Sequence, residues 1–409
     1  MNFKKITAFS FYDFGNSVFP MIVVTALTSS YFVNHIVDNQ QTGTALWQLT
    51  IGIAGIFIAV LMPFIGNVAD SQVNGRIKFL RVFSLLTVLS IAVFYFVLPS
   101  NGYVLIALII LFVGSVSYEA SNSLYNSSMK NCNENDLTLT SGIGFASGFL
   151  GGVIMLSFLL YFLILPDQNI FGVSKIDHLN IRFSHLILAF WFLIFCLPLL
   201  YFCKIDQQNS SLKSKTTSKI KDLIWRGNLT NTGKFLLARM LYMDGMIIIS
   251  TTMGIFGTSV MGLSIGKILL VGILANISGA IACYLFGKFF KDDKKNIIIT
   301  LFALSLVIFL ISINKNSNLF LVLVVIGTFF AGPLQSSSRV VMAELTDDRD
   351  QGFGFGMFTF AGKATAVIGP ICAAVLTYFI SQRVGLAFSI ILLLSGAFIM
   401  LKVSYSNQN

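Results

Sequence analysis

Continuous apolar runs of about 20 residues recur along the whole chain, and they limit the possible folds more than any other feature. A helix of roughly 20 apolar residues crosses the ~30 Å hydrocarbon core of a bilayer, whereas the strands of a membrane barrel show short alternating segments. The runs lie near residues 7–33, 45–69, 79–99, 102–129, 138–165, 183–203, 234–258, 264–287, 296–313, 318–343, 353–380 and 384–403. The sequence therefore predicts an all-α membrane protein with twelve transmembrane helices.

The composition excludes a soluble protein of this length. Charged residues make up only 11 % of the chain, against roughly 25 % in ordinary soluble domains, and hydrophobic residues make up 56 %. The formal net charge of +10 does not indicate nucleic-acid binding, because the basic residues lie between apolar runs, where they orient a protein in the bilayer.

The basic residues also predict the topology. If the N-terminus is cytoplasmic, 20 Lys and Arg side chains fall on the cytoplasmic side and five on the other side, with two inside spans. Such a split follows the positive-inside rule and requires an even number of spans. We expect an integral, multi-pass protein of a bacterial inner membrane, with both termini in the cytoplasm.

A polar stretch at 204–233 divides the chain into two parts with six spans each. We expect an N-terminal six-helix half at 1–203, a cytoplasmic central loop at 204–233 and a C-terminal six-helix half at 234–409. The first span of each half carries a similar segment, FYDFGNS and LYMDGMI. Two repeated six-helix halves are the plan of a secondary transporter whose site lies at the midplane between them.

Four ionisable residues lie deep inside spans, at Asp13, Glu119, Asp244 and Lys363. The three carboxylates are eight to eleven residues from the nearest cytoplasmic Lys, and Lys363 is ten residues into its span, or roughly 12–16 Å along a helix in each case. Charges at this depth are costly, so they face a polar cavity or pair with one another. The candidate substrate or ion ligands are these four residues together with Asn16, Arg239 and Gln335.

The residue types suggest separate roles. Lys363 is expected to bind an anionic or zwitterionic solute. A carboxylate in a poorly hydrated cavity can load and release a proton, so Asp13 or Asp244 is the expected proton site, with Glu119 in reserve. The alternative is that Asp13 and Asp244 pair with Arg239 or Lys363 and only hold helices in register.

The segment GNVADSQVNGRIKFL after the second span resembles the major facilitator superfamily signature G-x-x-x-D-x-x-G-R-K, with two extra residues. In that resemblance Asp70 is a conformational latch at the N-terminus of helix 11, whose dipole favours an anion. We expect Asp70 to bond near Gly352–Gly354, with Arg76 and Arg81 holding it from the loop. Arg339 is a further gating candidate, or a helix-end anchor. The alternative for Asp70 is a residue that merely ends a helix.

Four further segments carry a narrower resemblance. They are YDFGNS at 12–17, LARMLYMDG at 237–245, GPLQSSSRVVMAEL at 332–345 and FGFGMFTFAGKATAVIGP at 353–370. Together these segments resemble the autophagy-related vacuolar effluxer-like family of the superfamily. Fungal members export amino acids, so the resemblance implies an amino acid or a similar small metabolite as substrate.

Local spacing adds two structural expectations. Gly144, Gly148 and Gly152 repeat every four residues and predict a close helix contact for the fifth span. Pro20 and Pro370 predict interruptions in spans 1 and 11.

The most specific functional prediction is secondary active transport of a small solute by alternating access, coupled to protons. A drug or metabolite efflux pump of the same fold is the alternative. A polytopic enzyme is disfavoured, because the longest loop is basic and the chain carries no catalytic motif. The expected partners are the solute, protons and the bilayer, without nucleic acid, metal or cofactor, and the expected state is a monomer.

Overall fold

The computed structural model describes residues 3–202, 215–366 and 368–404. Residues 204–214 of the predicted central loop lie outside the described residues.

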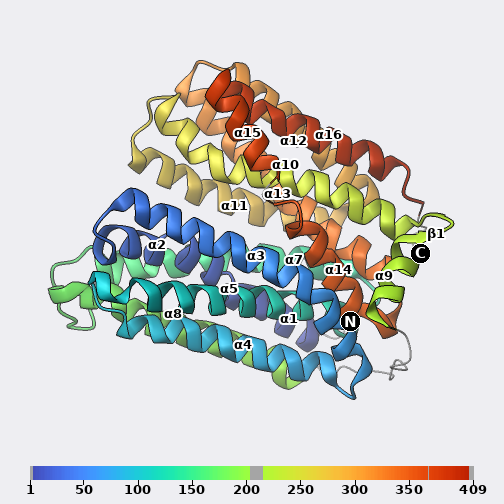
Figure 1. Cartoon of the computed structure of the whole chain (residues 1–409), viewed down its shortest axis with the longest axis horizontal. Helices are drawn as coiled ribbons and strands as arrows, with labels where there is room; N and C mark the ends of the chain where they lie inside the picture. The colour runs from blue at the N-terminus through green and yellow to red at the C-terminus, as the bar shows by residue number, and fades with distance from the viewer. Residues whose placement is uncertain (1–2, 203–214, 367, 405–409) are drawn as a thin grey trace.

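Two groups of helices make up the molecule (Figure 1). The N-terminal group consists of α1 (Phe3–Asn16), α2 (Leu27–Tyr31), α3 (Gln40–Ser71), α4 (Gly75–Val93), α5 (Val104–Ser127), α6 (Met129–Cys132), α7 (Leu137–Leu159) and α8 (Leu179–Phe202). The C-terminal group consists of α10 (Asn231–Ser259), α11 (Ile265–Phe289), α12 (Asp293–Ile313), α13 (Ser317–Leu345), α14 (Gln351–Lys363), α15 (Ile368–Phe379) and α16 (Gln382–Leu401). Between them lie helix α9 (Thr216–Ile224) and the strands β1 (Trp225–Arg226) and β2 (Asn228–Leu229).

Twelve helical segments among the described residues are long and apolar enough to cross a membrane, which confirms the predicted number of spans. Two of the spans are discontinuous. The first leaves α-helical geometry after Asn16 and continues through the π-helical segment Phe19–Val24, which contains Pro20. The eleventh is divided between α14 and α15, just before Pro370. Proline lacks an amide hydrogen and its ring obstructs the preceding turn, so both interruptions are expected.

The predicted loop at 204–233 contains more structure than the sequence suggests. In α9, the apolar side chains of Ile220, Leu223 and Ile224 pack against the main core, which explains why a largely polar segment forms a helix. The turn between β1 and β2 is made by Gly227, whose φ of +77° suits glycine. Helix α10 then begins at Asn231, three residues earlier than predicted, because the Thr230 side chain caps it by accepting a bond from the Gly233 amide at 2.9 Å.

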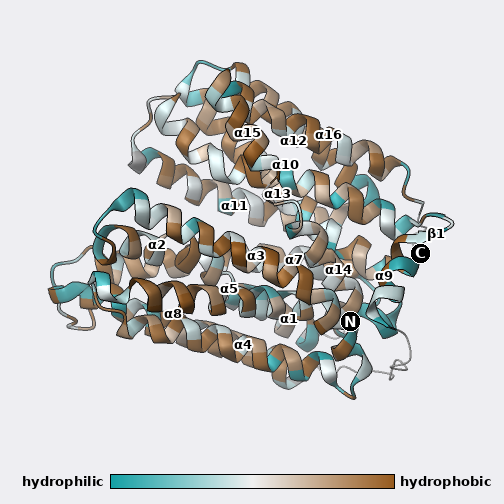
Figure 2. Ribbon diagram, in the orientation of Figure 1, coloured by the Kyte–Doolittle hydropathy of each residue, from teal (hydrophilic) through white to brown (hydrophobic). Residues whose placement is uncertain are grey.

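The outer faces of the helices are apolar (Figure 2). Leu105, Leu269 and Leu306 are each about 60 to 70 % exposed, and many other large apolar side chains are exposed beside them. Water would not tolerate so large an apolar surface, whereas lipid tails match it. Hydrophilic residues gather at the ends of the helices in Figure 2, as expected for a protein that spans a bilayer.

Both described chain ends lie at one end of the molecule, which we call the terminal face (Figure 1). The two groups of helices converge toward this face and spread apart toward the opposite face. Here α14 packs on α3, and α11 packs on α7. The backbones touch at glycines: a Cβ atom at Gly142 of α7 would lie 2.9 Å from the Cα atom of Gly287 on α11.

The glycine repeat in α7 has a different partner. Cβ atoms at Gly148 and Gly151 would meet the backbone of Asp13 and Phe14 on α1. Gly148 and nearby Gly151 therefore join two helices of the same group, whereas Gly144 also meets the Arg339 side chain of α13. A separate glycine, Gly142, meets the backbone of α11.

We predict that Gly142→Val lowers the melting temperature of the purified protein by several degrees, because overpacking a close contact costs about 1–3 kcal/mol. The matched control is Gly55→Val in α3, where an added Cβ atom meets nothing within 4 Å. Equal melting temperatures for the two variants would contradict a tight contact at Gly142.

Candidate functional site

Asp70 joins the end of α3 to the start of α14 at the terminal face. Its carboxylate accepts hydrogen bonds from the backbone amides of Gly352 at 3.0 Å and Phe353 at 2.7 Å, and it forms an ion pair with Arg76. The first amides of a helix have no partner inside the helix, and the helix dipole adds attraction for an anion. Asp70 and Arg76 are both buried. The two groups of helices are therefore linked by a charged cap at the position that the sequence indicates.

Helix α4, and not the loop that the sequence predicts, adds a second link, and it does so through only one of the two predicted arginines. Arg76 also donates to the carbonyl of Asp348, in the short turn before α14, at 2.7 Å. Arg81, which was expected to hold Asp70, instead donates to the carbonyl of Leu200 on α8 at 2.7 Å. Because Arg81 lies in α4 beyond the tight turn at Gly75, its side chain extends along its own helix group.

Arg339 on α13 reaches across to three helices of the N-terminal group. Its guanidinium lies 3.1 Å from Asp13 Oδ2, donates to Asn126 Oδ1 at 3.0 Å, and bonds Ser141 through both the hydroxyl and the carbonyl at 2.9 and 2.8 Å. The hydroxyl of Tyr125 donates to the same Asp13 oxygen at 2.7 Å. Two residues assigned separate roles from the sequence, Asp13 and Arg339, thus form one buried ion pair.

Glycine makes room for this pair. A Cβ atom at Gly144 would lie 2.6 Å from Asp13 Oδ2 and 2.8 Å from Arg339 Nη2. The ring of Phe145 lies next to Gly144, with its centre 4.4 Å from the Arg339 guanidinium carbon. The pair is therefore enclosed, and the separation of α13 from α7 would expose or break it.

A second ion pair crosses between the groups nearer the middle of the molecule. Lys363 Nζ, at the end of α14, lies 2.8 Å from Glu119 Oε1 on α5. The Lys363 side chain is 36 % exposed and that of Glu119 is 21 % exposed, so this pair is more accessible than the pair made by Arg339. Lys363 is therefore not an isolated amine, because Glu119 already neutralises it.

Arg239 on α10 is buried and has no carboxylate within ion-pair distance in the described part of the chain. It donates to the carbonyl of Phe358 at 3.2 Å and to the hydroxyl of Tyr242 at 3.4 Å. Its guanidinium carbon stacks 3.3 Å above the centre of the Phe358 ring. Tyr242 in turn bonds the Ser338 hydroxyl at 2.8 Å, which connects α10 to α13. A buried guanidinium with neutral partners retains the capacity to bind an anion.

Asp244 lies beside the interruption of the eleventh span. A Cβ atom at Gly369 would lie 2.9 Å from the Asp244 Cβ atom, so glycine allows α10 and α15 to approach. Asp244 is buried, and its Oδ1 atom has no hydrogen-bond partner among the described residues. Asp244 pairs with neither Arg239 nor Lys363 in the described structure, which contradicts the alternative that it holds helices in register through them.

Two other predicted ligands have weak partners. The Nδ2 atom of buried Asn16 has no hydrogen-bond partner among the described residues. Gln335 Nε2 lies 3.0 Å from the sulfur of Met243 on α10, and a thioether is a weak acceptor.

Sequence reasoning did not identify Tyr125 and Ser141 as site residues. Both bond the Asp13 and Arg339 pair, yet neither carries a charge that would single it out inside an apolar run. The only available signal for Tyr125 was its neighbour Asn126, a polar amide inside the fourth span. Within the described residues, no group of three or more His, Cys, Asp or Glu side chains is placed to hold a metal ion.

The chain is similar to a known protein family and to two bacterial proteins. The family model for "Vacuole effluxer Atg22 like" proteins matches residues 130–409. The uncharacterized MFS-type transporter YxiO of Bacillus subtilis (strain 168) is 23 % identical over 403 residues, covering 95 % of this chain and 92 % of that protein. An uncharacterized protein of Aquifex aeolicus (strain VF5) is 30 % identical over 158 residues, or 38 % of each chain.

Solved structures show the same fold at low sequence identity. The human organic anion transporter MFSD10 has a TM-score of 0.75 and 14 % identity, over 98 % of this chain and 99 % of that chain. The transporter FucP in its outward conformation has a TM-score of 0.71 and 13 % identity, over 99 % of each. The fold is therefore that of an integral multi-pass membrane protein. The family match and the likeness to YxiO over most of both chains make the molecule a transporter and not an enzyme. Because the family model covers more than half of its length, the chain belongs to the vacuole effluxer Atg22-like family within the major facilitator superfamily.

Proposed function

We propose that this protein is a secondary active transporter of a small carboxylate-bearing solute, such as an amino acid, and that it works by alternating access coupled to protons. The observation that carries the proposal is Arg239, a buried cation without a carboxylate within ion-pair distance among the described residues. It lies eight residues into α10, roughly 12 Å along the helix, near the middle of the membrane. The carboxylate of a solute would supply the missing charge through a two-pronged hydrogen bond.

Lys363 and Glu119 support the same location. Arg239 lies beside the neighbour of Lys363, because a Cβ atom at Gly362 would be 3.3 Å from Arg239 Nη2. Two cations therefore lie close together here, and among the described residues only Lys363 has a carboxylate partner, Glu119. A bound carboxylate would balance the local charge and would compete with Glu119 for Lys363. Such competition would weaken a link between the two groups of helices when the solute binds.

The links at the terminal face support alternating access. Asp70 with α14, Asp13 with Arg339, and Glu119 with Lys363 each join the N-terminal group to the C-terminal group. We propose that the terminal face is cytoplasmic, in a bacterial inner membrane, because it carries the excess of Lys and Arg. The structure would then represent the state that is closed toward the cytoplasm, in a protein that acts as a monomer.

Two carboxylates are suited to carry the coupling proton. Asp244 has a buried oxygen without a hydrogen-bond partner among the described residues, which is costly for a charged carboxylate and is relieved by a proton. Protonation of Asp13 would instead remove the charge that holds Arg339, and so would favour opening of the terminal face. The solved proton:xylose symporter XylE has a similar fold, with a TM-score of 0.74 at 12 % identity.

For proton coupling, we predict that Asp244→Asn abolishes solute accumulation driven by a pH gradient in proteoliposomes but leaves solute-for-solute exchange intact. Solute-for-solute exchange needs the solute-binding site but no net movement of protons across the membrane. The control is Asp177→Asn, which removes an exposed carboxylate near the opposite face. The assignment fails if Asp244→Asn and Asp13→Asn each still accumulate solute when only a pH gradient is imposed.

For solute binding, we predict that Lys363→Met abolishes uptake and that the double variant Lys363→Met with Glu119→Gln does not recover it. If Lys363 only neutralised Glu119, the double variant would recover uptake, because removal of both charges leaves no unpaired carboxylate. Uptake by both variants is measured with a labelled solute, and folding is checked by melting temperature. Recovery in the double variant would show that Lys363 serves only Glu119.

For gating, we predict that Asp70→Asn shifts the population toward the state open at the terminal face by roughly tenfold, since about 1.4 kcal/mol corresponds to one decade. Cysteines introduced at Thr140 and Val341, which are buried here, should then react faster with a reagent applied from that face. Asp347→Asn, an exposed change at the same face, is the control. Unchanged labelling with normal transport would make Asp70 a helix-ending residue only.

A further inference from the structure

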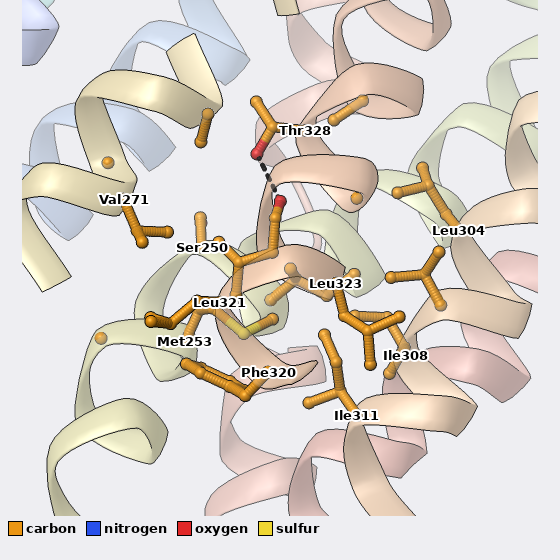
Figure 3. A pocket seen from close by; sticks show the side chains of 18 of the residues that line it. Ser250, Met253, Val271, Leu304, Ile308, Ile311, Phe320, Leu321, Leu323 and Thr328 are labelled. Atoms are coloured by element: carbon orange, nitrogen blue, oxygen red, sulfur yellow. Dashed lines mark hydrogen bonds between the residues drawn. The ribbon is translucent and has the colours of Figure 1, made fainter. Parts of the chain in front are cut away.

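Four helices of the C-terminal group line an apolar pocket of about 340 Å³ (Figure 3). Helices α10, α11, α12 and α13 contribute its walls, with Met253, Val271, Ile308 and Leu323 among the side chains drawn around it. The volume is within the range of pockets that bind small molecules.

The few polar side chains in the lining are already bonded to their own helices. Ser250 donates to the Ile247 carbonyl at 3.0 Å, Asn276 to the Gly272 carbonyl at 2.7 Å, and Thr328 to the Val324 carbonyl at 3.1 Å. The Thr328 bond is the dashed line in Figure 3. The pocket therefore suits an apolar group and not a charged one.

Glycines create much of this space. Cβ atoms added at Gly254 of α10 or Gly272 of α11 would meet nothing within 4 Å, although both residues line the pocket. Ordinary side chains at these two positions would occupy the volume. Glycine in a helix interior costs roughly 1 kcal/mol relative to alanine, so these two positions keep the space open at a cost in helix stability.

The pocket lies in line with the polar site along two helices. On α10, Arg239, Met246 and Met253 are seven residues apart and so share one face, and the two methionines line the pocket. On α13, Gln335 is seven residues from Thr328, which also lines the pocket.

Helices α10 and α13 contact each other beside the polar site, where Tyr242 bonds Ser338 and Gln335 contacts Met243. Seven helical residues span about 10 Å, which is the distance along α10 from Arg239 to the edge of the pocket.

We propose that the pocket binds the apolar tail of an amphipathic monocarboxylate whose carboxylate is held by Arg239. The proposal rests on the proposed function, since it extends the same site by naming the class of solute. The occupant has a carboxylate at one end and an alkyl or aryl body long enough to pass Met246 and fill the pocket. Such a solute is bound by charge at Arg239 and by burial of apolar surface among α10 to α13.

The test is a binding series with straight-chain carboxylates from butyrate to dodecanoate, measured by calorimetry on the purified full-length protein. Affinity should rise about fourfold for each methylene group that enters the pocket and then level off, because each buried methylene contributes a fixed increment. Gly272→Leu and Gly254→Leu should abolish the rise. Gly266→Leu is the matched control, since it lies on the same helix as Gly272, does not line the pocket and also has open space around its Cβ position.

The head group is tested separately. Arg239→Gln should weaken binding of every chain length by a similar factor without changing the dependence on length. Alcohols of matching length should bind more weakly than the carboxylates do.

The outcomes separate the two proposals. An affinity that does not change with length, or a rise that persists in both leucine variants, overturns the pocket assignment; loss of short-chain binding in Arg239→Gln would then still support the proposed function. A rise that the leucine variants abolish, with every chain length bound as tightly by Arg239→Gln as by the unaltered protein and the alcohols bound as tightly as the carboxylates, overturns the carboxylate assignment. The occupant would in that case be a lipid acyl chain.

Discussion

The buried ion pair between Arg339 and Asp13 is the interaction on which the arrangement of the two helix groups depends. Four hydrogen-bond acceptor atoms, on Asp13 of α1, Asn126 of α5 and Ser141 of α7, surround one guanidinium from α13. Removal of one partner from a buried pair typically costs about 3–5 kcal/mol, because the remaining charge is left in a medium that cannot solvate it. The groups cannot separate at this level unless both charges find water or new partners, or Asp13 takes up a proton.

The other links between the groups follow from that closure. With α13 held against α7, the start of α14 lies next to the end of α3, where Asp70 caps its free amides. Glycines at both contacts let the backbones approach, and a Cβ atom at Gly352 would lie 2.7 Å from Asp70 Oδ1. The links differ in exposure: the pairs made by Asp70 and Arg339 are enclosed, while the pair of Glu119 and Lys363 is open enough for a solute to reach. This difference in exposure suits a transporter, since the accessible ion pair can respond to the solute before the enclosed pairs open.

The interruption of the eleventh span positions the charged side chains that lie deep inside the membrane-spanning helices. The interruption after Lys363 ends α14 beside Glu119, and α15 begins at Ile368 with Gly369 against Asp244. Broken helices inside a membrane are tolerated where they are buried in protein or line a polar site, and they recur at the substrate sites of secondary transporters. The polar region around Arg239 and the apolar pocket beyond Met246 share one face of α10, so a single helix presents both kinds of surface.

Much of this protein could be predicted from the sequence because the bilayer imposes simple rules. Apolar runs of helix-spanning length set the number of spans, the asymmetry of Lys and Arg set the expected orientation, and prolines marked both interruptions. Charges such as Asp13, Glu119, Asp244 and Lys363 were recognisable as site candidates because isolated charges are expensive in lipid. The partners of those charges were not predictable. Asp13 pairs with Arg339, 326 positions away, and Arg81 turns to α8 instead of Asp70.

The glycine repeat shows the same division. Its spacing predicted a close helix contact, but only the folded chain decided that Gly148 meets the backbone of α1 and that a different glycine of the same helix, Gly142, meets the backbone of α11. The sequence by itself determined which segments cross the membrane and which residues are too polar to face lipid, since both depend on local composition. The tertiary structure decided which charges neutralise each other, which remain available for a ligand, and where a pocket stays open, because these depend on distances between helices that are far apart in the chain.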